Sequence, residues 1–413
     1  MLEIQRYGAK GAVLKYIQEA DPSIPILPFF NLAVGTSWRD HEDKITSLGD
    51  KLMVRSSSPQ EDCPKVSFAG IFSTQYCYNN STSTIDWNVN SVIRSLQNKN
   101  AQRYAQIHKV QEPLTMGLLF QKYHPGSKWS MLRHPHQEKV IFLSHLLGEE
   151  CKGLDYVYRE DTKEVHTLDN FQRKEELTNL SSDLPLALET YARIEKLPEF
   201  QTSYTYQMEF GTLPFSVFQF RPFRKKETAS WKCVPDKPRM ENYSFPFGIT
   251  PEEGIELKVV RAIQQIQEYQ RFKNIMEQNR SKDKIKTIIR FLGLNPEERI
   301  YAERLVQGYN PEEYSPTLQL DQILQELNEI YSEENTAVTT GNLHYNPKGI
   351  DIDFPNAKAW IPSKDGNHGF LAHGTFRAIQ HYDISLMGYG CKKRTGGRIR
   401  IFSDGINARI EPG

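Results

Sequence analysis

The sequence KLMVRSSSPQEDCPKVSFAGIFSTQY (residues 51–76) places a cation, several hydroxyls and two carboxylates between short apolar runs. The first run, Leu52–Val54, is typical of a strand and ends directly at Arg55, which three serines follow. A guanidinium at a strand end offers a planar fork to a phosphate, and serines add donors beside it. The alternative is a polar hairpin connection in which Arg55 pairs with Glu61 or Asp62. The stretch by itself is compatible with both interpretations.

Two other segments supply groups of similar chemistry. YGAKGAVL (residues 7–14) places Lys10 between glycines, where a lysine can meet a phosphate while the backbone comes close. YQMEFGTLPFSVFQFRPF (residues 206–223) contains Glu209, Gln219 and Arg221. If its two halves are adjacent antiparallel strands, Glu209 and Gln219 can offer oxygens to one Mg²⁺. Arg221 then shares the face of Gln219, because strand side chains alternate. The alternative is a half-buried hairpin with ion-paired ends.

The composition limits the classes of protein. Charges balance at 51 basic and 51 acidic side chains, which removes the general electrostatic argument for binding nucleic acid or a membrane surface. Five widely spaced cysteines without a CxxC pair are typical of free thiols in a reducing compartment. No apolar stretch is long enough for a membrane span, and the first 20 residues lack a signal-type apolar block. We therefore expect a cytoplasmic protein with no nucleic-acid or membrane partner.

The chain divides into regions of different pattern, which predict an α+β multidomain fold. Residues 1–225 mix short strand-like runs with helices. Residues 226–335 are predicted to form a helical region, and residues 336–413 a small α/β domain. The sequence gives no indication of the oligomeric state.

The helical prediction for the middle region comes from spacing and capping. Apolar side chains recur at intervals of three and four, beginning with Ile255, Val259 and Ile263. Helix starts are indicated by TPEE at Thr250, and again by NPEE at residues 295 and 310, because each joins a capping side chain to a proline at the first helical position.

The last region has a pattern of its own. KAWIP (residues 358–362) is predicted to be a strand, and ISLMGYG (residues 384–390) a strand and turn. HGTFRAIQHY (residues 373–382) is predicted to be a helix, and RIRIFSDGINARIE (residues 398–411) a hairpin.

The order of several motifs resembles the pyruvate phosphate dikinase and phosphoenolpyruvate synthase family. The N-terminal motifs are GAKGAVL, VRSSSPQEDCPKVSFAGIFST, LLFQKYHPG, LLGEECKGLDYVY and VFQFRPF. In the family they belong to an ATP-grasp nucleotide-binding domain, and the resemblance covers residues 1–225. GFLAHGTFRAIQHYDISLMGYG (residues 369–390) resembles the family's swivelling phosphohistidine segment. The domain order most resembles that of rifampin phosphotransferases, in reduced form.

The resemblance implies ATP and Mg²⁺ as cofactors and assigns roles to individual residues. Lys10, Arg55 and Gln121 would bind the nucleotide, and Glu209 with Gln219 would hold Mg²⁺. The two catalytic residues would be Arg221, which stabilises the transferred phosphoryl group, and His373, which receives it. A neutral imidazole is nucleophilic near neutral pH, and phosphoryl transfer asks mainly for positioning and charge neutralisation. Glu61 and Asp62 are expected to be structural partners of the phosphate-binding groups.

The sequence also departs from the family. Only about 40 residues separate the lysine and Arg-Ser-Ser motifs, so a helical subdomain is shortened. Gln207 stands where the family often has an acid. Leu371 and Ala372 precede His373 in place of small polar residues, which leaves His368 and His381 as alternative carriers.

No stretch of the sequence corresponds to the large barrel that binds pyruvate or phosphoenolpyruvate, so a different small-molecule acceptor is expected. The leading hypothesis is an AMP-forming phosphotransferase with a phosphohistidine intermediate. Two alternatives stay open. One is an ATP-grasp kinase or ligase that transfers directly from ATP, and the other is a non-catalytic nucleotide sensor.

Overall fold

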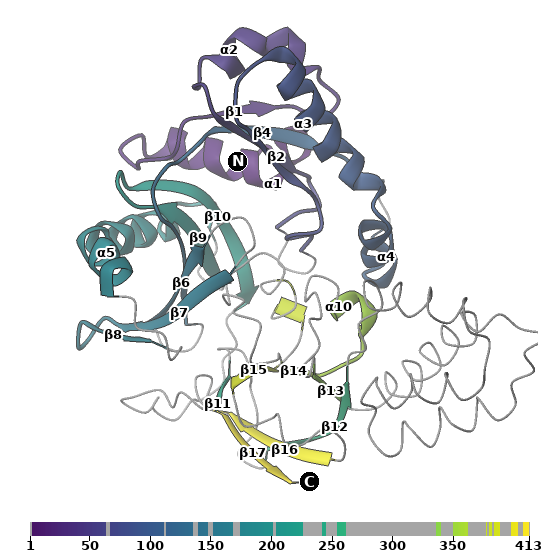
Figure 1. Cartoon of the computed structure of the whole chain (residues 1–413), viewed down its shortest axis with the longest axis vertical. Coiled ribbons are helices and arrows are strands. Elements are labelled where there is room, and N and C mark those ends of the chain that lie inside the picture. The colour runs from purple at the N-terminus through teal and green to yellow at the C-terminus, as the bar shows by residue number, and fades with distance from the viewer. Residues whose placement is uncertain are drawn as a thin grey trace, which may run out of the picture. The chain divides into compact units, whose positions relative to one another are not determined.

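The structure is a computed structural model (Figure 1). It describes residues 2–62, 67–110, 113–134, 139–147, 152–167, 174–200, 204–225, 242–244, 254–261, 336–339, 350–361, 377, 380–381, 384–388, 398–403 and 408–412. The chain forms two compact units. The first comprises Met1–Trp231 with Asn367–Gln380, and the second comprises Lys232–Gly366 with His381–Gly413. The predicted domain boundaries at residues 225 and 335 stay predictions.

A four-stranded antiparallel sheet forms one layer of the first unit, in the order β1-β4-β2-β3 (Figure 1). Its strands are β1 (Phe29–Leu32), β2 (Leu52–Ser57), β3 (Thr74–Cys77) and β4 (Gly117–Lys122). The strand predicted at Leu52–Val54 is confirmed as part of β2, which is buried along its whole length. The helices of this part are α1 (Ile4–Ala20), η1 (Trp38–His41), α2 (Glu42–Thr46), α3 (Thr82–Arg94), η2 (Ser95–Gln97) and α4 (Lys99–Ile107).

A six-stranded antiparallel sheet forms the rest of the first unit, in the order β10-β9-β5-β6-β7-β8. Its strands are β5 (Lys128–Arg133), β6 (Val140–Leu147), β7 (Lys152–Arg159), β8 (Glu164–Thr167), β9 (Tyr204–Gly211) and β10 (Ser216–Lys225). The core of this part joins Ile17 of α1 and Tyr191 of α5 (Lys174–Glu195) to Met131 and Phe220 of the sheet. α1 also contacts β2 and β4, so the helix that contains Lys10 lies where the two sheets meet.

The second unit is built on a seven-stranded sheet in the order β11-β15-β14-β13-β12-β16-β17. Its strands are β11 (Asn242–Ser244), β12 (Ile255–Arg261), β13 (Thr336–Thr339), β14 (Ala359–Ile361), β15 (Ile384–Gly388), β16 (Arg398–Ser403) and β17 (Ala408–Pro412), and a short helix, α10 (Ile350–Asp353), precedes β14. The strands predicted in residues 358–362 and 384–390 are confirmed over 359–361 and 384–388, and the closing hairpin is confirmed; the turn predicted after residue 388 lies outside the described residues. Residues 377, 380 and 381 are helical, as predicted for that segment.

The helical prediction was wrong at residues 255–261. This segment is strand β12, which pairs in parallel with β13 and antiparallel with β16. Positions four residues apart lie on the same face of a helix and also on the same face of a strand. Ile255 and Val259 therefore fit either structure, and in a strand Leu257 shares their face. Leu257 is fully buried among residues of the neighbouring strands. The helix predicted to begin at Thr250 therefore does not run through this segment, and residues 262–335 lie outside the described residues.

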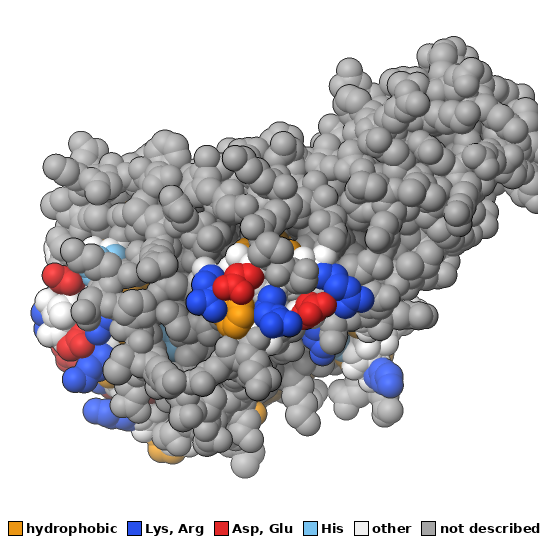
Figure 2. Space-filling model, turned by 90° about the horizontal axis from the view of Figure 1, so that it is seen from below, with side chains coloured by type: hydrophobic (Ala, Val, Ile, Leu, Met, Phe, Trp, Pro, Cys, Tyr) orange, Lys and Arg blue, Asp and Glu red, His pale blue; other side chains and the backbone are white. Residues whose placement is uncertain are grey.

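Charges of both signs are mixed on the surface of the seven-stranded sheet. Glu256 of β12 lies 3.2 Å from Arg398 and 3.4 Å from Arg400 of β16, and Arg409 lies 3.0 Å from Glu411 within β17. Figure 2 shows Lys and Arg side chains interspersed with Asp and Glu side chains in the described part of one face. Opposite charges on neighbouring strands are mildly stabilising. The charge of this described surface is thus neutralised locally.

Candidate functional site

The two strands that were predicted to hold Glu209 and Gln219 form a hairpin. β9 and β10 pair antiparallel, with Gln219 opposite Glu209 and Arg221 opposite Gln207. This register confirms the predicted pairing and brings the side chains together. Glu209, Gln219 and Arg221 are all buried.

Arg55 connects the four-stranded sheet to this hairpin. Its Nη1 donates to Gln121 Oε1 of β4 at 2.8 Å and to the Phe218 carbonyl at 3.2 Å. Its Nη2 donates to Gln219 Oε1 at 2.6 Å and lies 3.4 Å from Glu209 Oε2. The guanidinium fork thus reaches residues of both sheets, as its fixed planar geometry allows. The predicted residues Arg55, Gln121, Glu209 and Gln219 are brought into one cluster.

Asp62 occupies the centre of the cluster, although the sequence indicated only a structural partner. Its Oδ1 lies 3.2 Å from Arg221 Nη1, and its Oδ2 accepts from Gln219 Nε2 at 2.8 Å. The backbone of Asp62 has φ of 55°, a left-handed conformation that Asp adopts more readily than most residues. In the sequence, the only sign of this role was that Asp62 directly follows Glu61, shortly after the Arg-Ser-Ser motif.

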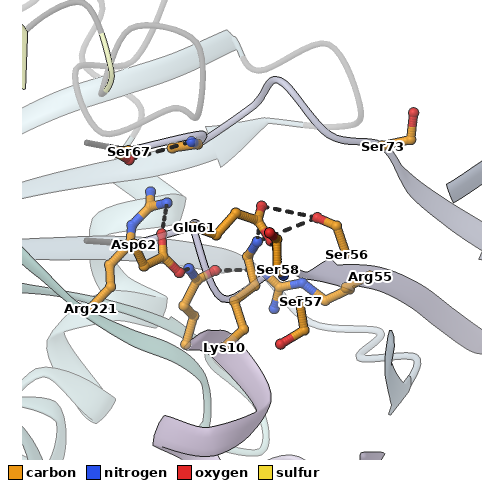
Figure 3. A network of polar contacts seen from close by, with 12 residues as sticks. Lys10, Arg55, Ser56, Ser57, Ser58, Glu61, Asp62, Ser67, Ser73 and Arg221 are labelled. Carbon is orange, nitrogen blue, oxygen red and sulfur yellow. Dashed lines mark hydrogen bonds and ion pairs between the residues drawn. The ribbon is translucent and has the colours of Figure 1, made fainter. Parts of the chain in front are cut away.

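Lys10 lies beside this cluster and forms an ion pair with Glu61 (Figure 3). Ser56 Oγ donates to Glu61 Oε1 at 3.0 Å, and the Ser58 amide donates to Glu61 Oε2 at 3.0 Å. Burial raises the pKa of the Glu61 carboxyl; Lys10 opposes this shift, and the neighbouring Asp62 charge adds to it. The alternative pairing of Arg55 with Glu61 or Asp62 is not what the structure has, because these carboxylates bond Lys10 and Arg221 instead.

The glycine motif brings backbone close to backbone. Gly8, with φ of 73°, interrupts α1, and a Cβ there would lie 1.7 Å from the Ser57 carbonyl oxygen. The helix resumes at Ala9, whose amide donates to the Ser58 carbonyl at 3.1 Å, and the Gly11 amide donates to Ser57 Oγ at 2.9 Å. The motif fixes α1 against the end of β2, and its predicted role in the approach of a phosphate stays a prediction.

Gln207 has a defined function in this arrangement. Its Oε1 accepts from Arg221 Nε at 2.6 Å, and its Nε2 donates to Ser130 Oγ of β5 at 2.6 Å. An ionised carboxylate could accept from Arg221 but could not donate to the serine oxygen. Gln207 therefore orients the Arg221 side chain.

The charges of the cluster balance. The cations Lys10, Arg55 and Arg221 are matched by the carboxylates of Glu61, Asp62 and Glu209. A buried charge is costly unless it is paired, so these ion pairs offset the cost of burying the three cations.

The donor set fits Mg²⁺. Mg²⁺ is held in proteins by one or two carboxylates and other hard oxygens, together with phosphate oxygens. Glu209 and Gln219 supply a carboxylate and an amide oxygen from directly paired positions. The distances of 3.4 and 3.5 Å from Glu209 to Arg55 and Arg221 are longer than a tight hydrogen bond, so this carboxylate is held between two guanidiniums without a close bond to either.

A comparison with protein-family models matches residues 10–127 to the pyruvate phosphate dikinase AMP/ATP-binding domain. The matched stretch begins at Lys10 and includes Arg55, Asp62 and Gln121. At the level of this domain, the match supports the dikinase family. It supports an ATP-dependent enzyme as well. β9 and β10 lie beyond the matched stretch.

Solved structures similar to the chain include D-alanine-D-alanine ligases. The ligase from Coxiella burnetii is 9% identical with a TM-score of 0.29 over 55% of this chain and 50% of that one. The Bacillus anthracis ligase complexed with ATP is 10% identical with a TM-score of 0.26, over 51% and 52%. The ATP-grasp ligase PsnB is 9% identical with a TM-score of 0.25, over 51% and 47%. The chain thus spans about half the length of these structures. A comparison with curated proteins found no match.

The predicted carrier lies outside the described residues. His373, His368, Leu371 and Ala372 all belong to the stretch 362–376, which the structure does not describe. His381, the other alternative carrier, places Nε2 at 2.9 Å from the Pro355 carbonyl oxygen. A carbonyl can only accept, so this nitrogen carries the proton and is not a nucleophile while the bond persists. Within the described residues, no helix is both long and apolar enough to cross a membrane.

Proposed function

We propose that this protein is an ATP- and Mg²⁺-dependent phosphotransferase of the dikinase type, which moves a phosphoryl group through His373 to a small-molecule acceptor. The observation that supports the proposal is the cluster in which Arg55 contacts Gln121, Glu209 and Gln219. It joins residues of the family-matched domain to the hairpin that the resemblance assigns to metal binding. The resemblance in domain order to a reduced rifampin phosphotransferase belongs to the same proposal.

The residues of the cluster would act through charge and position. Lys10 and Arg55 would bind the phosphates, and Arg221 would stabilise charge on the transferred group. Glu209 and Gln219 would hold Mg²⁺, which when bound neutralises phosphate charge. To contact a phosphate, each cation would have to break its ion pair with a carboxylate. The triphosphate would therefore replace the internal ion pairs rather than enter an already positive site.

The products define which bonds change. If AMP is released, the bond that breaks joins the α-phosphate to the β-phosphorus, and an imidazole nitrogen of His373 forms the new bond to that phosphorus. Water then releases the γ-phosphate as inorganic phosphate. The remaining phosphoryl group passes to an acceptor hydroxyl, which loses its proton, and His373 is regenerated. A direct kinase would instead break the β–γ bond and release ADP.

The test is labelling with ATP that carries ³²P at the β-phosphate, in the presence of Mg²⁺. Wild type should acquire acid-labile label and form AMP, and His373→Ala should not. His381→Ala is the matched control and should keep the label. ADP formation that survives His373→Ala would overturn the proposal in favour of direct transfer. Nucleotide binding without turnover would favour a sensor.

A further inference from the structure

A buried arginine from the C-terminal part of the chain belongs to the first unit. Arg377 lies in the segment Asn367–Gln380, which groups with Met1–Trp231. Its side chain is 1% exposed. Nη1 donates to the Ala69 carbonyl at 3.0 Å, and the guanidinium carbon lies 5.4 Å from the centre of the Tyr104 ring. A guanidinium in this position is attracted to the ring face.

Ala69 presents its carbonyl from a rigid turn. The Ile71 amide donates to the Phe68 carbonyl at 3.0 Å, and Gly70 has φ of 71°. A positive φ at the third position is typical of a type II turn, whose second residue does not use its carbonyl in the turn's own bond. The Phe68 ring packs edge-on against Tyr104 at 4.9 Å between ring centres. The Ala69 turn and the Tyr104 ring, which both contact Arg377, are therefore held together.

A second residue of the same segment contacts β10. Gln380 Nε2 donates to the Phe223 carbonyl at 2.6 Å. Residues three apart lie on one face of a helix, and both Arg377 and Gln380 are helical. Phe223 follows Arg221 by two residues along the strand. One helix face thus contacts the Phe68–Ile71 turn and the end of β10 together.

The same two parts of the chain are joined inside the candidate site. Asp62, five residues before the Ser67–Ala69 motif, pairs with Arg221 of β10 at 3.2 Å. Arg377 and Gln380 therefore contact Ala69 and Phe223, which lie close in the sequence to the paired residues Asp62 and Arg221 of the candidate site. Arg377 follows His373 by four residues in the segment that the sequence predicts to be a helix, and residues 373–376 lie outside the described residues.

We infer that Arg377 is a docking residue, which together with Gln380 holds the segment of His373 against the nucleotide site while ATP phosphorylates it. The inference rests on the proposed function and adds to it a positioning residue. Transfer requires the imidazole nitrogen close to the phosphorus and in line with the leaving oxygen. The Ala69 carbonyl and the Tyr104 ring are two of the groups that contact this arginine.

The test compares Arg377→Gln with wild type in the full chain, and Arg409→Gln at an exposed arginine is the matched control. The rate of label transfer from β-labelled ATP to the protein should fall about tenfold or more in Arg377→Gln, because misplacement of a reacting group slows transfer by that order. Affinity for α,β-methylene-ATP, which cannot donate the group, should change less than about twofold, since binding and transfer report different interactions. Arg377→Lys should restore part of the rate. Amide exchange in residues 67–72 should become faster in Arg377→Gln.

Gln380→Ala provides a second test if Arg377→Gln unfolds, and it should slow labelling in the same direction. Equal labelling rates in wild type, Arg377→Gln and Gln380→Ala would overturn the docking role and leave the proposed function intact. A parallel loss of ATP affinity and labelling would also overturn it, because Arg377 would then support the nucleotide site itself. Absence of label in wild type would overturn the proposed function, and the docking role with it.

Discussion

Asp62 and Arg221 form a buried ion pair, with Oδ1 and Nη1 3.2 Å apart, between a loop after β2 and the strand β10. Asp62→Asn removes the charge but keeps the shape of the side chain. We expect a loss of about 3–5 kcal/mol in the free energy of unfolding, because a buried guanidinium loses one of its carboxylate partners. Urea denaturation measures the change. Asp161→Asn, at a more exposed pair with Arg159, is the control and should have little effect. Equal effects of the two substitutions would show that the buried pair is not stabilising.

Gly8 and Gly35 allow a matched test of close backbone packing. Both have positive φ, at 73° and 77°, but only Gly8 has atoms in the position of a Cβ, whereas Gly35 has nothing within 4 Å of it. Gly35→Ala should cost about 1–2 kcal/mol, the penalty of a left-handed conformation. Gly8→Ala should cost more than this, since the Ser57 carbonyl must also move. Thermal and urea unfolding of both variants measure the difference. Similar losses for the two variants would contradict the packing of α1 on β2.

Lys10 can be tested separately for binding and for stability. Lys10→Met should weaken Mg·ATP binding about tenfold to a hundredfold, the range for a hydrogen bond to a charged group. It should also destabilise the fold, because Glu61 loses its cation. The double variant Lys10→Met with Glu61→Gln should regain stability without regaining affinity. Isothermal titration and urea unfolding give the two quantities, with Lys15→Met on the same helix as control. Recovery of affinity in the double variant would mean that Lys10 acts only as a structural partner.

Glu209→Gln tests the metal site. We expect the Mg²⁺ concentration needed for half-maximal labelling to rise about tenfold or more, as for other losses in a metal's ligand environment. Electron paramagnetic resonance of Mn²⁺ bound with an ATP analogue gives a direct measure of affinity. Glu189→Gln, at an exposed position of α5, controls for the change in net charge. Unchanged Mn²⁺ affinity would remove Glu209 from the metal site.

The pH dependence of stability should reveal the burial of Glu61. Its pKa is raised in the folded protein above the ordinary value of 4.5, so the folded state binds the proton more tightly than the unfolded state. Between 4.5 and the raised pKa, the free energy of unfolding should therefore fall as pH rises. The difference between wild type and Glu61→Gln should grow in favour of wild type as the pH is lowered through this interval. Urea unfolding at a series of pH values measures it, and a difference that shrinks on acidification would contradict the raised pKa.

The sequence was sufficient for the hairpin and for most of the cluster, because local chemistry decided them. The alternation of side chains in residues 206–223 predicted a face shared by Gln219 and Arg221, and the register of β9 and β10 follows it. The pairing of individual cations with individual carboxylates was not predictable from the sequence. Which carboxylate meets which cation depends on how two sheets approach each other, so Asp62 was assigned a minor part and Glu209 was not expected beside Arg55.

The strand at residues 255–261 was missed for a different reason. Its apolar positions satisfy a helix and a strand equally, and only pairing with β13 and β16 selects the strand. Those partners lie about 80 and 140 residues further along the chain, so no local rule could supply them.

The ion pairs of the cluster join residues that are synthesised far apart in time. Arg55 and Glu209 are 154 residues apart, and Asp62 and Arg221 are 159 apart. During translation, the chain that contains β2 would leave the ribosome with these cations and carboxylates unmatched until β10 had followed. Closing such long loops is slow, so the cluster should be among the last parts of the first unit to form. A fragment restricted to residues 10–127 would therefore contain Arg55 and Asp62 without their partners Glu209 and Arg221. In a nascent chain of that length, these charges would be solvated by water or covered by a chaperone.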